Sequence, residues 1–207
     1  MNNTYEFYKR AKQKVIDLGY ENEIVWQTEQ SPDHINEQTF LQEAAWVIYC
    51  SGFREETVRQ HFNLISLCFC DWESAETIAK KKIMCISSAM CVFKNSRKHC
   101  AVAEVADIIS NHGFANYKKK LNENTLETLQ QLPFIGKITS YHLAKNLGFD
   151  IAKPDRHLTR LTKYFGYDNV NTLCKEISCH SGDPVRVVDL ILWRYLERQQ
   201  MFKEHIV

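Results

Sequence analysis

The most informative stretch of the chain reads Leu132-Pro133-Phe134-Ile135-Gly136-Lys137-Ile138-Thr139. Residues 125–131, which precede it, carry leucines at helical spacing, and Pro133 prevents that helix from continuing smoothly. Residues 138–147 form a second helical segment, which Gly148 is suited to end. We therefore expect a short helix, a four-residue hairpin and a second helix.

This hairpin has the features of a site for phosphate. Gly136 can adopt a positive φ and has no side chain to obstruct an approaching group. The first N–H groups of the second helix would point outward beside it, and Lys137 would add a positive charge. A purely structural helical hairpin, as found in many all-α proteins, is the alternative.

A carboxylate follows the second helix. The segment 153–155 is Lys-Pro-Asp, and residues 156–165 form an amphipathic helical pattern directly after it. Asp155 is therefore an N-cap, a catalytic carboxylate, or both.

Charge is distributed unevenly along the chain, although the net charge is only +1. Residues 137–164 contain six lysines and arginines and two acidic residues, whereas residues 21–43 contain six acidic residues and no lysine or arginine. This polarity suggests one face that binds phosphates and another that is turned away from them, although a basic stretch can also be a solvated helix face. The residues expected to contact a DNA backbone are Gly136, Lys137, Thr139, Lys145, Arg156, His157 and Arg160.

Taken together, the hairpin and the carboxylate resemble the helix-hairpin-helix DNA glycosylase superfamily, which includes endonuclease III and the 8-oxoguanine and alkyladenine glycosylases. The family's hairpin pattern is leucine, proline, glycine, hydrophobic, glycine, and this chain has Phe134 in place of the first glycine. The positions that match the family's hairpin and carboxylate motifs are Leu132, Pro133, Ile135, Gly136, Pro154, Asp155 and His157. The strong part of the resemblance covers residues 130–160.

The resemblance implies an all-α fold in which two helical lobes flank a cleft. Residues 35–130 would form one lobe with a wedge turn, and residues 1–34 together with 131–207 would form the other, with the helix-hairpin-helix and the catalytic aspartate. The acidic stretch up to Asp33 is expected to be irregular, and residues 116–124 are the best linker candidate.

Helical periodicity and capping residues predict most of the elements. The last helix should start at Asp183-Pro184, a cap followed by proline at the first helical position, and run to about residue 199. The other expected helices cover residues 5–18, 36–50, 54–67, 74–81, 83–93, 97–111, 125–131, 138–147, 156–165 and 170–178.

The implied activity is excision of a base that has been flipped out of the duplex. In relatives the gap-filling residue lies at the turn formed here by residues 50–54, so Phe53 or Arg54 could act as a wedge. Phe53 could equally be a core residue and Arg54 a surface charge. Asp155 would stabilise the positive charge that grows on the sugar and would orient or deprotonate a water molecule.

Relatives that also nick the strand have a lysine two residues after the second hairpin glycine. That position is Ile138 here, and Lys137 lies about 100° round the helix from it. We therefore expect a monofunctional glycosylase that leaves an abasic site. The alternatives are a bifunctional glycosylase and lyase that uses Lys137, a non-catalytic helix-hairpin-helix DNA-binding protein, and an unrelated all-α protein.

Aromatic side chains suit a pocket for a planar base. Trp46, Tyr49 and Trp193 could also be core residues, and a single histidine is usually structural. The candidate pocket residues are Glu43, Trp46, Tyr49, Tyr141, His142 and Trp193. The mismatch-adenine branch of the family has a helical glutamate where this chain has Val47, so an alkylated or otherwise modified base is favoured.

No cofactor is expected to be required. By the resemblance, the backbone carbonyls of Gln130, Leu132 and Ile135 would hold a monovalent cation that bridges to a DNA phosphate. The iron–sulfur cluster of some relatives should be absent, because the last cysteines are Cys174 and Cys179 alone. The eight cysteines show no clear zinc pattern, and buried thiols are the simplest interpretation.

The expected partner is double-stranded DNA, bound by a monomer. No apolar stretch is long enough to span a membrane, and the N-terminus lacks the apolar region of a signal peptide. These features predict a reducing compartment, which in a bacterium would be the cytoplasm, in association with the nucleoid.

Overall fold

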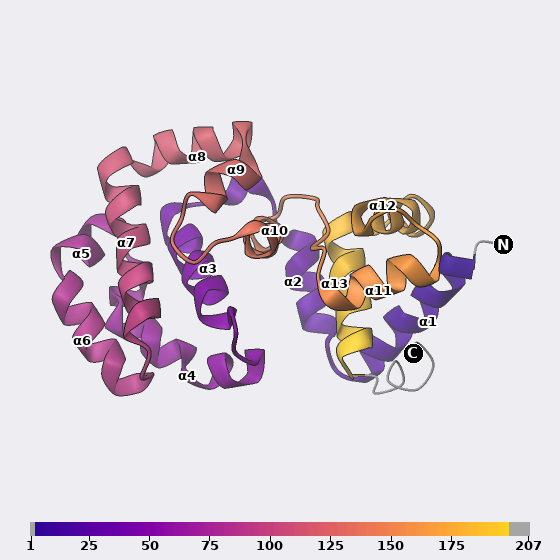
Figure 1. Cartoon of the computed structure of the whole chain (residues 1–207), viewed down its shortest axis with the longest axis horizontal. Helices are drawn as coiled ribbons and strands as arrows, with labels where there is room; N and C mark the ends of the chain where they lie inside the picture. The colour runs from indigo at the N-terminus through magenta and orange to yellow at the C-terminus, as the bar shows by residue number, and fades with distance from the viewer. Residues whose placement is uncertain (1–2, 199–207) are drawn as a thin grey trace. The chain divides into compact units, whose positions relative to one another are not determined.

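The computed structural model describes residues 3–198, which form thirteen α-helices and two short 3-10 helices and contain no strand (Figure 1). The expected all-α class is therefore confirmed for this part of the chain. None of these helices combines the length and the apolar composition that crossing a bilayer requires.

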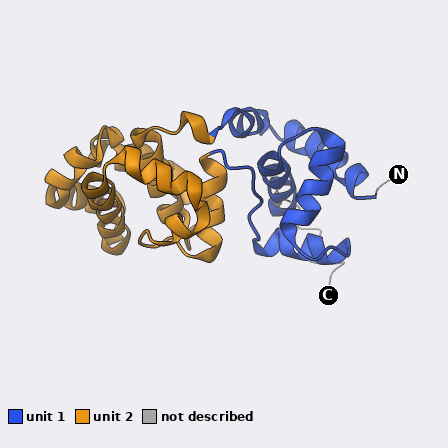
Figure 2. Ribbon diagram, turned by 90° about the horizontal axis from the view of Figure 1, so that it is seen from above, with its two compact units in different colours: residues 1–31, 148–207 blue, residues 32–147 orange. Residues whose placement is uncertain are grey.

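The chain divides into two compact units (Figure 2). We call residues 1–31 and 148–207 the terminal unit and residues 32–147 the central unit. The hairpin segment was expected to join the terminal part of the chain, but it belongs to the central unit. The reason is packing, since α10 (Lys137–Asn146) buries Leu143 and Ala144 and contacts α9 (Thr125–Gln130) and α3 (Glu37–Cys50).

The central unit is built around α3 (Glu37–Cys50), which packs against α7 and α10. Asn36 caps α3 by accepting a hydrogen bond from the N–H of Thr39, and Asn95 caps α7 in the same way. The other helices of this unit are η1 (Pro32–His34), α4 (Glu55–Cys68), η2 (Cys70–Trp72), α5 (Ala75–Lys80), α6 (Lys82–Val92), α7 (Ser96–His112), α8 (Phe114–Glu123) and α9 (Thr125–Gln130).

The terminal unit consists of helices from both ends of the chain. Its core lies between α1 and α13, where Tyr8, Ala11 and Val15 are buried together with Val188 and Ile191. The helices of this unit are α1 (Asn3–Asp17), α2 (Glu21–Glu29), α11 (Arg156–Tyr164), α12 (Val170–Ser181) and α13 (Val185–Arg198).

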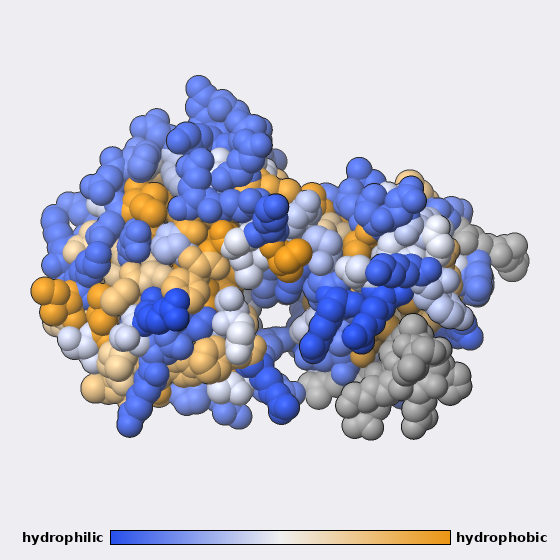
Figure 3. Space-filling model, in the orientation of Figure 1, coloured by the Kyte–Doolittle hydropathy of each residue, from blue (hydrophilic) through white to orange (hydrophobic). Residues whose placement is uncertain are grey.

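The visible surface of each unit is largely hydrophilic, and that of the central unit also includes patches of apolar residues (Figure 3). Large exposed apolar side chains of that unit include Phe53, Leu67, Ile83, Phe134 and Ile138. Three of them, Phe53, Phe134 and Ile138, lie on segments that the sequence assigned to DNA contact.

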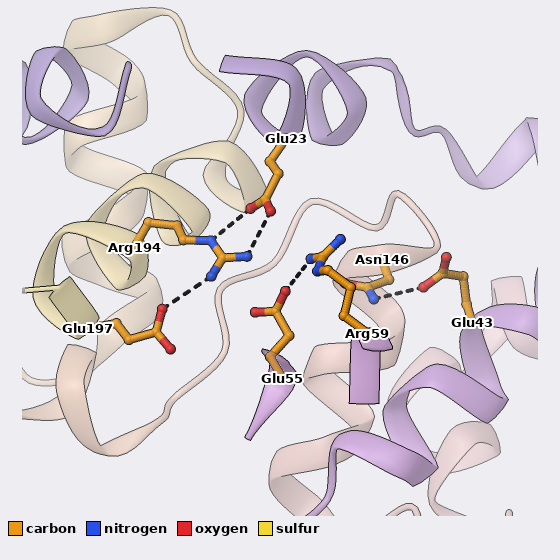
Figure 4. Close-up of polar contacts among 7 residues, drawn as sticks. All are labelled: Glu23, Glu43, Glu55, Arg59, Asn146, Arg194 and Glu197. Atoms are coloured by element: carbon orange, nitrogen blue, oxygen red, sulfur yellow. Dashed lines mark hydrogen bonds and ion pairs between the residues drawn. The ribbon is translucent and has the colours of Figure 1, made fainter. Parts of the chain in front are cut away.

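Two segments expected to be irregular are helical. The acidic stretch contains α2, which Arg194 holds by donating to both carboxylate oxygens of Glu23 over 2.7 and 2.9 Å (Figure 4). The proposed linker at 116–124 lies mostly in α8, where Tyr117 and Leu121 are buried. Tyr117 and Leu121 are spaced one helical turn apart, a pattern that the three neighbouring lysines obscured.

Asp183 is not used as the expected cap. Its carboxylate accepts a hydrogen bond from the hydroxyl of Tyr8 over 2.6 Å and forms an ion pair with Lys12 over 2.7 Å. Burial and this carboxylate raise the pKa of Tyr8 far above its usual value. Asp183 therefore joins α1 to the start of α13 by side-chain contacts.

Candidate nucleic-acid interface

The hairpin that joins α9 to α10 has its left-handed residue at an unexpected position. Gly136 has a φ of −94°, whereas Phe134 has a φ of +64°. The expectation that Gly136 would supply the positive φ is therefore wrong. Gly136 still leaves open space, because an added Cβ would approach no neighbouring heavy atom more closely than 4.0 Å.

The N-terminus of α10 combines free donors with a positive charge. The N–H of Gly136 donates to Oγ1 of Thr139 over 2.7 Å, so the threonine completes the cap. Within residues 3–198, the N–H groups of Lys137, Ile138 and Thr139 have no acceptor, and Lys137 is exposed. Such a helix terminus can bind an anionic oxygen.

Three further candidate residues of α10 are partly or fully buried. Lys145 is buried, with 5% of its surface exposed, so the expectation that it contacts a DNA backbone is wrong. Tyr141 and His142, which were candidates for a base pocket, are half-buried. The exposed lysine of this helix is therefore Lys137, at its N-terminal end.

The carbonyls proposed to hold a cation belong to the hairpin. The carbonyl of Leu132 accepts a hydrogen bond from the N–H of Ile135 over 3.2 Å. Those of Gln130 and Ile135 accept none from the described residues. Since each carbonyl oxygen has two lone pairs, all three keep acceptor capacity, which suits a monovalent cation.

The expected wedge residues lie in the turn between α3 and α4. Phe53 is 42% exposed, and its ring meets that of Phe93 edge to face at 5.2 Å. Arg54 is exposed, and its guanidinium forms no hydrogen bond or ion pair within residues 3–198. Both side chains are thus accessible on the surface of the central unit.

A buried lysine that sequence analysis missed fixes this turn. Lys98 is 3% exposed, and its Nζ donates to the carbonyls of Ile48 and Ser51, the latter over 2.7 Å. These carbonyls end α3, where a cation is favoured by the helix dipole. Burial lowers the pKa of Lys98. The capping pattern at Asn95 places Lys98 in the first turn of α7 but gives no sign that the lysine is buried.

Asp155 is the N-cap of α11, so the predicted capping role is confirmed. Its Oδ1 accepts hydrogen bonds from the N–H groups of His157 and Leu158 over 2.9 and 3.0 Å. Its Oδ2 has no partner among the described residues. One carboxylate oxygen thus holds the helix start, and the other can interact with a ligand or a water molecule.

The segment that leads to Asp155 is held by α13. The carboxylate of the buried Asp189 accepts from the N–H of Lys153 over 2.6 Å. Arg186 donates to Asp150 over 3.2 Å and also to the carbonyls of residues 27, 28 and 30, which end α2. No local sequence pattern marks these two positioning residues, since their partners lie far away in the sequence.

The basic residues of α11 remain available for phosphate contact. Arg156 and Arg160 are exposed, and His157 is half-buried. Arg156 donates from Nε to Nε2 of His157 over 3.3 Å. Because they lie one turn apart, Arg156 and Arg160 occupy the same side of α11.

The candidate pocket aromatics are mostly packed. Tyr49 is fully buried, and its hydroxyl is 2.6 Å from Nδ1 of His99. Nε2 of His99 is 2.6 Å from the carbonyl of Phe93 and must donate to it. Burial lowers the pKa of His99, and in the neutral ring Nδ1 then accepts from the Tyr49 hydroxyl. Tyr49 is therefore a core residue of the central unit and not part of an open pocket wall.

Trp46 and Trp193 are half-buried and lie in different units. Trp46 meets Phe62 edge to face at 5.0 Å and lies 5.4 Å from the guanidinium of Arg59. Trp193 lies 4.6 Å from the guanidinium of Arg194. Each indole therefore already packs within its own unit and presents only part of its surface.

Glu43 is the pocket candidate with an altered protonation equilibrium. Asn146 donates to its Oε2 over 2.8 Å (Figure 4). Burial raises the pKa of Glu43 to about 7, although the hydrogen bond opposes the shift. At neutral pH this carboxyl can therefore act either as a donor or as an acceptor.

Residues 3–198 contain no group of three or more His, Cys, Asp or Glu side chains that could hold a metal ion. The eight cysteines all lie in this range and none is in a disulfide. Comparison of the chain with protein-family models, curated proteins and solved structures gives no match.

Proposed function

We propose that this protein is a DNA glycosylase that flips a damaged or modified base out of duplex DNA and hydrolyses its N-glycosidic bond. The observation that carries the proposal is the state of Asp155, whose Oδ1 anchors α11 while Oδ2 has no partner in the described chain. The open N-terminus of α10 supports it, because that helix end can bind the phosphate backbone.

In the proposed reaction, the bond between the sugar C1′ and the base nitrogen breaks, and its electron pair leaves with the base. Asp155, as a carboxylate, stabilises the positive charge that develops on the sugar. A water oxygen then bonds to C1′, its proton passes to Asp155 or to solvent, and a base that departs as an anion takes up a proton from solvent. The products are the free base and an abasic site.

Strand cleavage is not part of the proposed reaction. A lyase step would need an amine that attacks C1′ and forms a Schiff base. Ile138, which is 44% exposed, occupies the position at which bifunctional relatives have lysine. Lys137 is exposed beside the free N–H groups of α10, a location that suits a phosphate contact.

A non-catalytic DNA-binding protein is the second candidate. The observation that favours it is the completeness of the Asp155 cap, because a cap of this geometry accounts for the residue without any chemistry. Such a protein would keep the open helix terminus and the basic side of α11, and replacing Asp155 with asparagine would leave its behaviour unchanged.

The test uses end-labelled duplexes that each carry one modified base, incubated with the purified protein. Each sample is divided between a direct denaturing gel and treatment with hot alkali. Cleavage after alkali alone would support a monofunctional glycosylase and identify its base. Cleavage without alkali, together with a borohydride-trapped complex that Lys137→Gln abolishes, would replace it with the lyase mechanism.

Two further results would reject the glycosylase. Tight, salt-sensitive binding without release of any base in the panel would favour the non-catalytic protein. If the protein bound no duplex at all, both candidate functions would fail, and the chain would be an all-α protein of another kind.

A further inference from the structure

The hairpin between α9 and α10 contains a strained aromatic residue. Phe134 has a φ of +64°, in the left-handed region that bulky residues rarely adopt. The residue is 38% exposed, so its ring is only partly buried. A glycine or asparagine would adopt this conformation at a lower cost. Strain of this kind can mark a ligand-binding position.

Two cations contact the Phe134 ring. Nζ of Lys98 lies 5.3 Å from the ring centroid, and the guanidinium of Arg97 lies 5.6 Å from it. Arg97 is exposed, whereas Lys98 is buried. Both distances are within the range of a cation–π interaction.

The same lysine contacts the second exposed aromatic residue of this surface. Nζ of Lys98 also lies 5.3 Å from the ring centroid of Phe53. Phe53 and Phe134 are 81 residues apart in the sequence, yet both rings lie next to one ammonium group. The hairpin and the turn between α3 and α4 are therefore linked through Lys98.

Lys98 itself is not available to a ligand. It is almost completely buried, and its Nζ donates to the carbonyls of Ile48 and Ser51. Its role is to hold the two rings, whose remaining surfaces are accessible to solvent. Exposed positive charges on the segments that carry these rings include Arg54, next to Phe53, Arg97, and Lys137 at the start of α10.

We propose that Phe53 and Phe134 form a two-ring platform that stacks on unpaired nucleobases where the DNA duplex is opened. A ligand that carries both planar rings and phosphates fits two exposed aromatic side chains beside exposed cations and free helix N–H groups. This inference rests on the proposed function, because it requires that the protein bind DNA. It adds a base-contacting role to a hairpin otherwise assigned to the backbone.

The test measures binding of fluorescein-labelled duplexes by anisotropy at one fixed salt concentration. One duplex contains a single tetrahydrofuran abasic analogue, which leaves a base unpaired, and the other is intact. Removing one stacking ring should weaken binding of the lesion duplex by roughly tenfold. Binding of the intact duplex should change by less than about twofold, because its bases stay stacked.

Three variants separate stacking from other roles of Phe134. Phe134→Gly removes both the ring and the strain, so its melting temperature should equal or exceed that of the wild type. Phe134→Asn removes the ring but keeps a side chain that tolerates a positive φ, which controls for a more flexible hairpin. Phe134→Tyr keeps the ring and should bind like the wild type. Ile83→Ala, at an exposed apolar residue of α6, controls for general loss of apolar surface.

The proposal is supported if the Gly and Asn variants lose affinity for the lesion duplex selectively and remain as stable as the wild type. It is overturned if they melt at lower temperature and bind both duplexes normally, since Phe134 would then serve packing alone. An equal loss on both duplexes would also overturn it, because the ring would then contact the backbone. If the wild type bound neither duplex, the proposed function would fail as well.

Discussion

Asn146, at the end of α10, donates a hydrogen bond from Nδ2 to Oε2 of Glu43, in the middle of α3, over 2.8 Å (Figure 4). These residues are 103 positions apart in the sequence. Their contact connects the helix that follows the hairpin to the central helix of the same unit. Burial at this position raises the pKa of the Glu43 carboxyl to about 7.

We expect this carboxyl to make the stability of the protein depend on pH. Because the pKa of Glu43 is about 7 in the folded protein and near 4.5 when exposed, the folded state holds a proton that the unfolded state releases between these values. The free energy of unfolding should therefore fall as the pH rises from about 5 to 8. A shift of this size corresponds to about 3 kcal/mol.

Urea unfolding of the wild type and Glu43→Gln at several pH values would measure this effect. Glutamine can still accept from Asn146 but does not titrate, so the variant should become the more stable protein toward pH 8. Glu127→Gln, at an exposed position of α9, is the matched control and should follow the wild type. Parallel pH profiles for wild type and Glu43→Gln would contradict the prediction.

Gly148, where the chain passes from the central unit back into the terminal unit, should not tolerate a side chain. Its φ is +89°, and an added Cβ would lie 2.6 Å from the backbone nitrogen of Ser31. Gly166 has a similar φ of +76° but no atom within 4 Å of such a Cβ. Gly166→Ala therefore incurs only the backbone strain, about 1–2 kcal/mol.

Gly148→Ala should destabilise the protein more than Gly166→Ala by at least about 1 kcal/mol, because overpacking adds to the strain. In a chain of this length each kcal/mol corresponds to about 2–4 °C in melting temperature. Thermal unfolding of both variants tests the difference. Equal melting temperatures would show that Gln30 and Ser31 move away without cost.

Asp155→Asn should distinguish the helix-capping role of Asp155 from its proposed role in base release. Asparagine caps helices about as well as aspartate, so the free energy of unfolding should change little. Base release should fall by at least roughly a hundredfold, since asparagine has no negative charge to stabilise the sugar cation and no basic oxygen. Both quantities are measured on the same preparation, by urea unfolding and by alkali-dependent strand cleavage.

Asn169→Ala is the control for Asp155→Asn. Asn169 caps α12 by accepting from the N–H of Thr172 over 2.9 Å. Its removal should cost about 1 kcal/mol of stability and leave base release unchanged. Full activity of Asp155→Asn would assign Asp155 to capping alone and reject the glycosylase.

Lys137→Gln should weaken DNA binding through the phosphate backbone. The slope of log K against log salt concentration should become smaller in magnitude by about 0.9, the value for one phosphate contact. The loss should be similar for duplexes of different sequence, because backbone contacts do not read bases. Lys119→Gln, at an exposed lysine of α8, should leave the slope unchanged. A slope equal to that of the wild type for Lys137→Gln would remove this lysine from the interface.

Local interactions made much of the fold predictable. Ten of the eleven expected helices have observed counterparts whose ends lie within three residues, among them α3, expected at 36–50 and observed at Glu37–Cys50. The eleventh, α13, starts two residues later than expected, and its expected end at residue 199 lies outside the described residues. The capping role of Asp155 was also open to prediction, because the acceptor and the two N–H groups lie within three residues of one another. The failures, at α2 and α8, fell on segments whose charged residues concealed short apolar faces.

The sequence by itself determined the helical class, most helix boundaries and the cap at Asp155, because these depend on contacts between residues one to four positions apart. Only the tertiary structure decided that the hairpin belongs to the central unit, that Lys98 and Lys145 are buried, and that Phe134 takes the left-handed conformation. The same is true of the raised pKa of Glu43, which arises from burial. Burial is set by packing between helices that are distant in the sequence, and no local pattern specifies it.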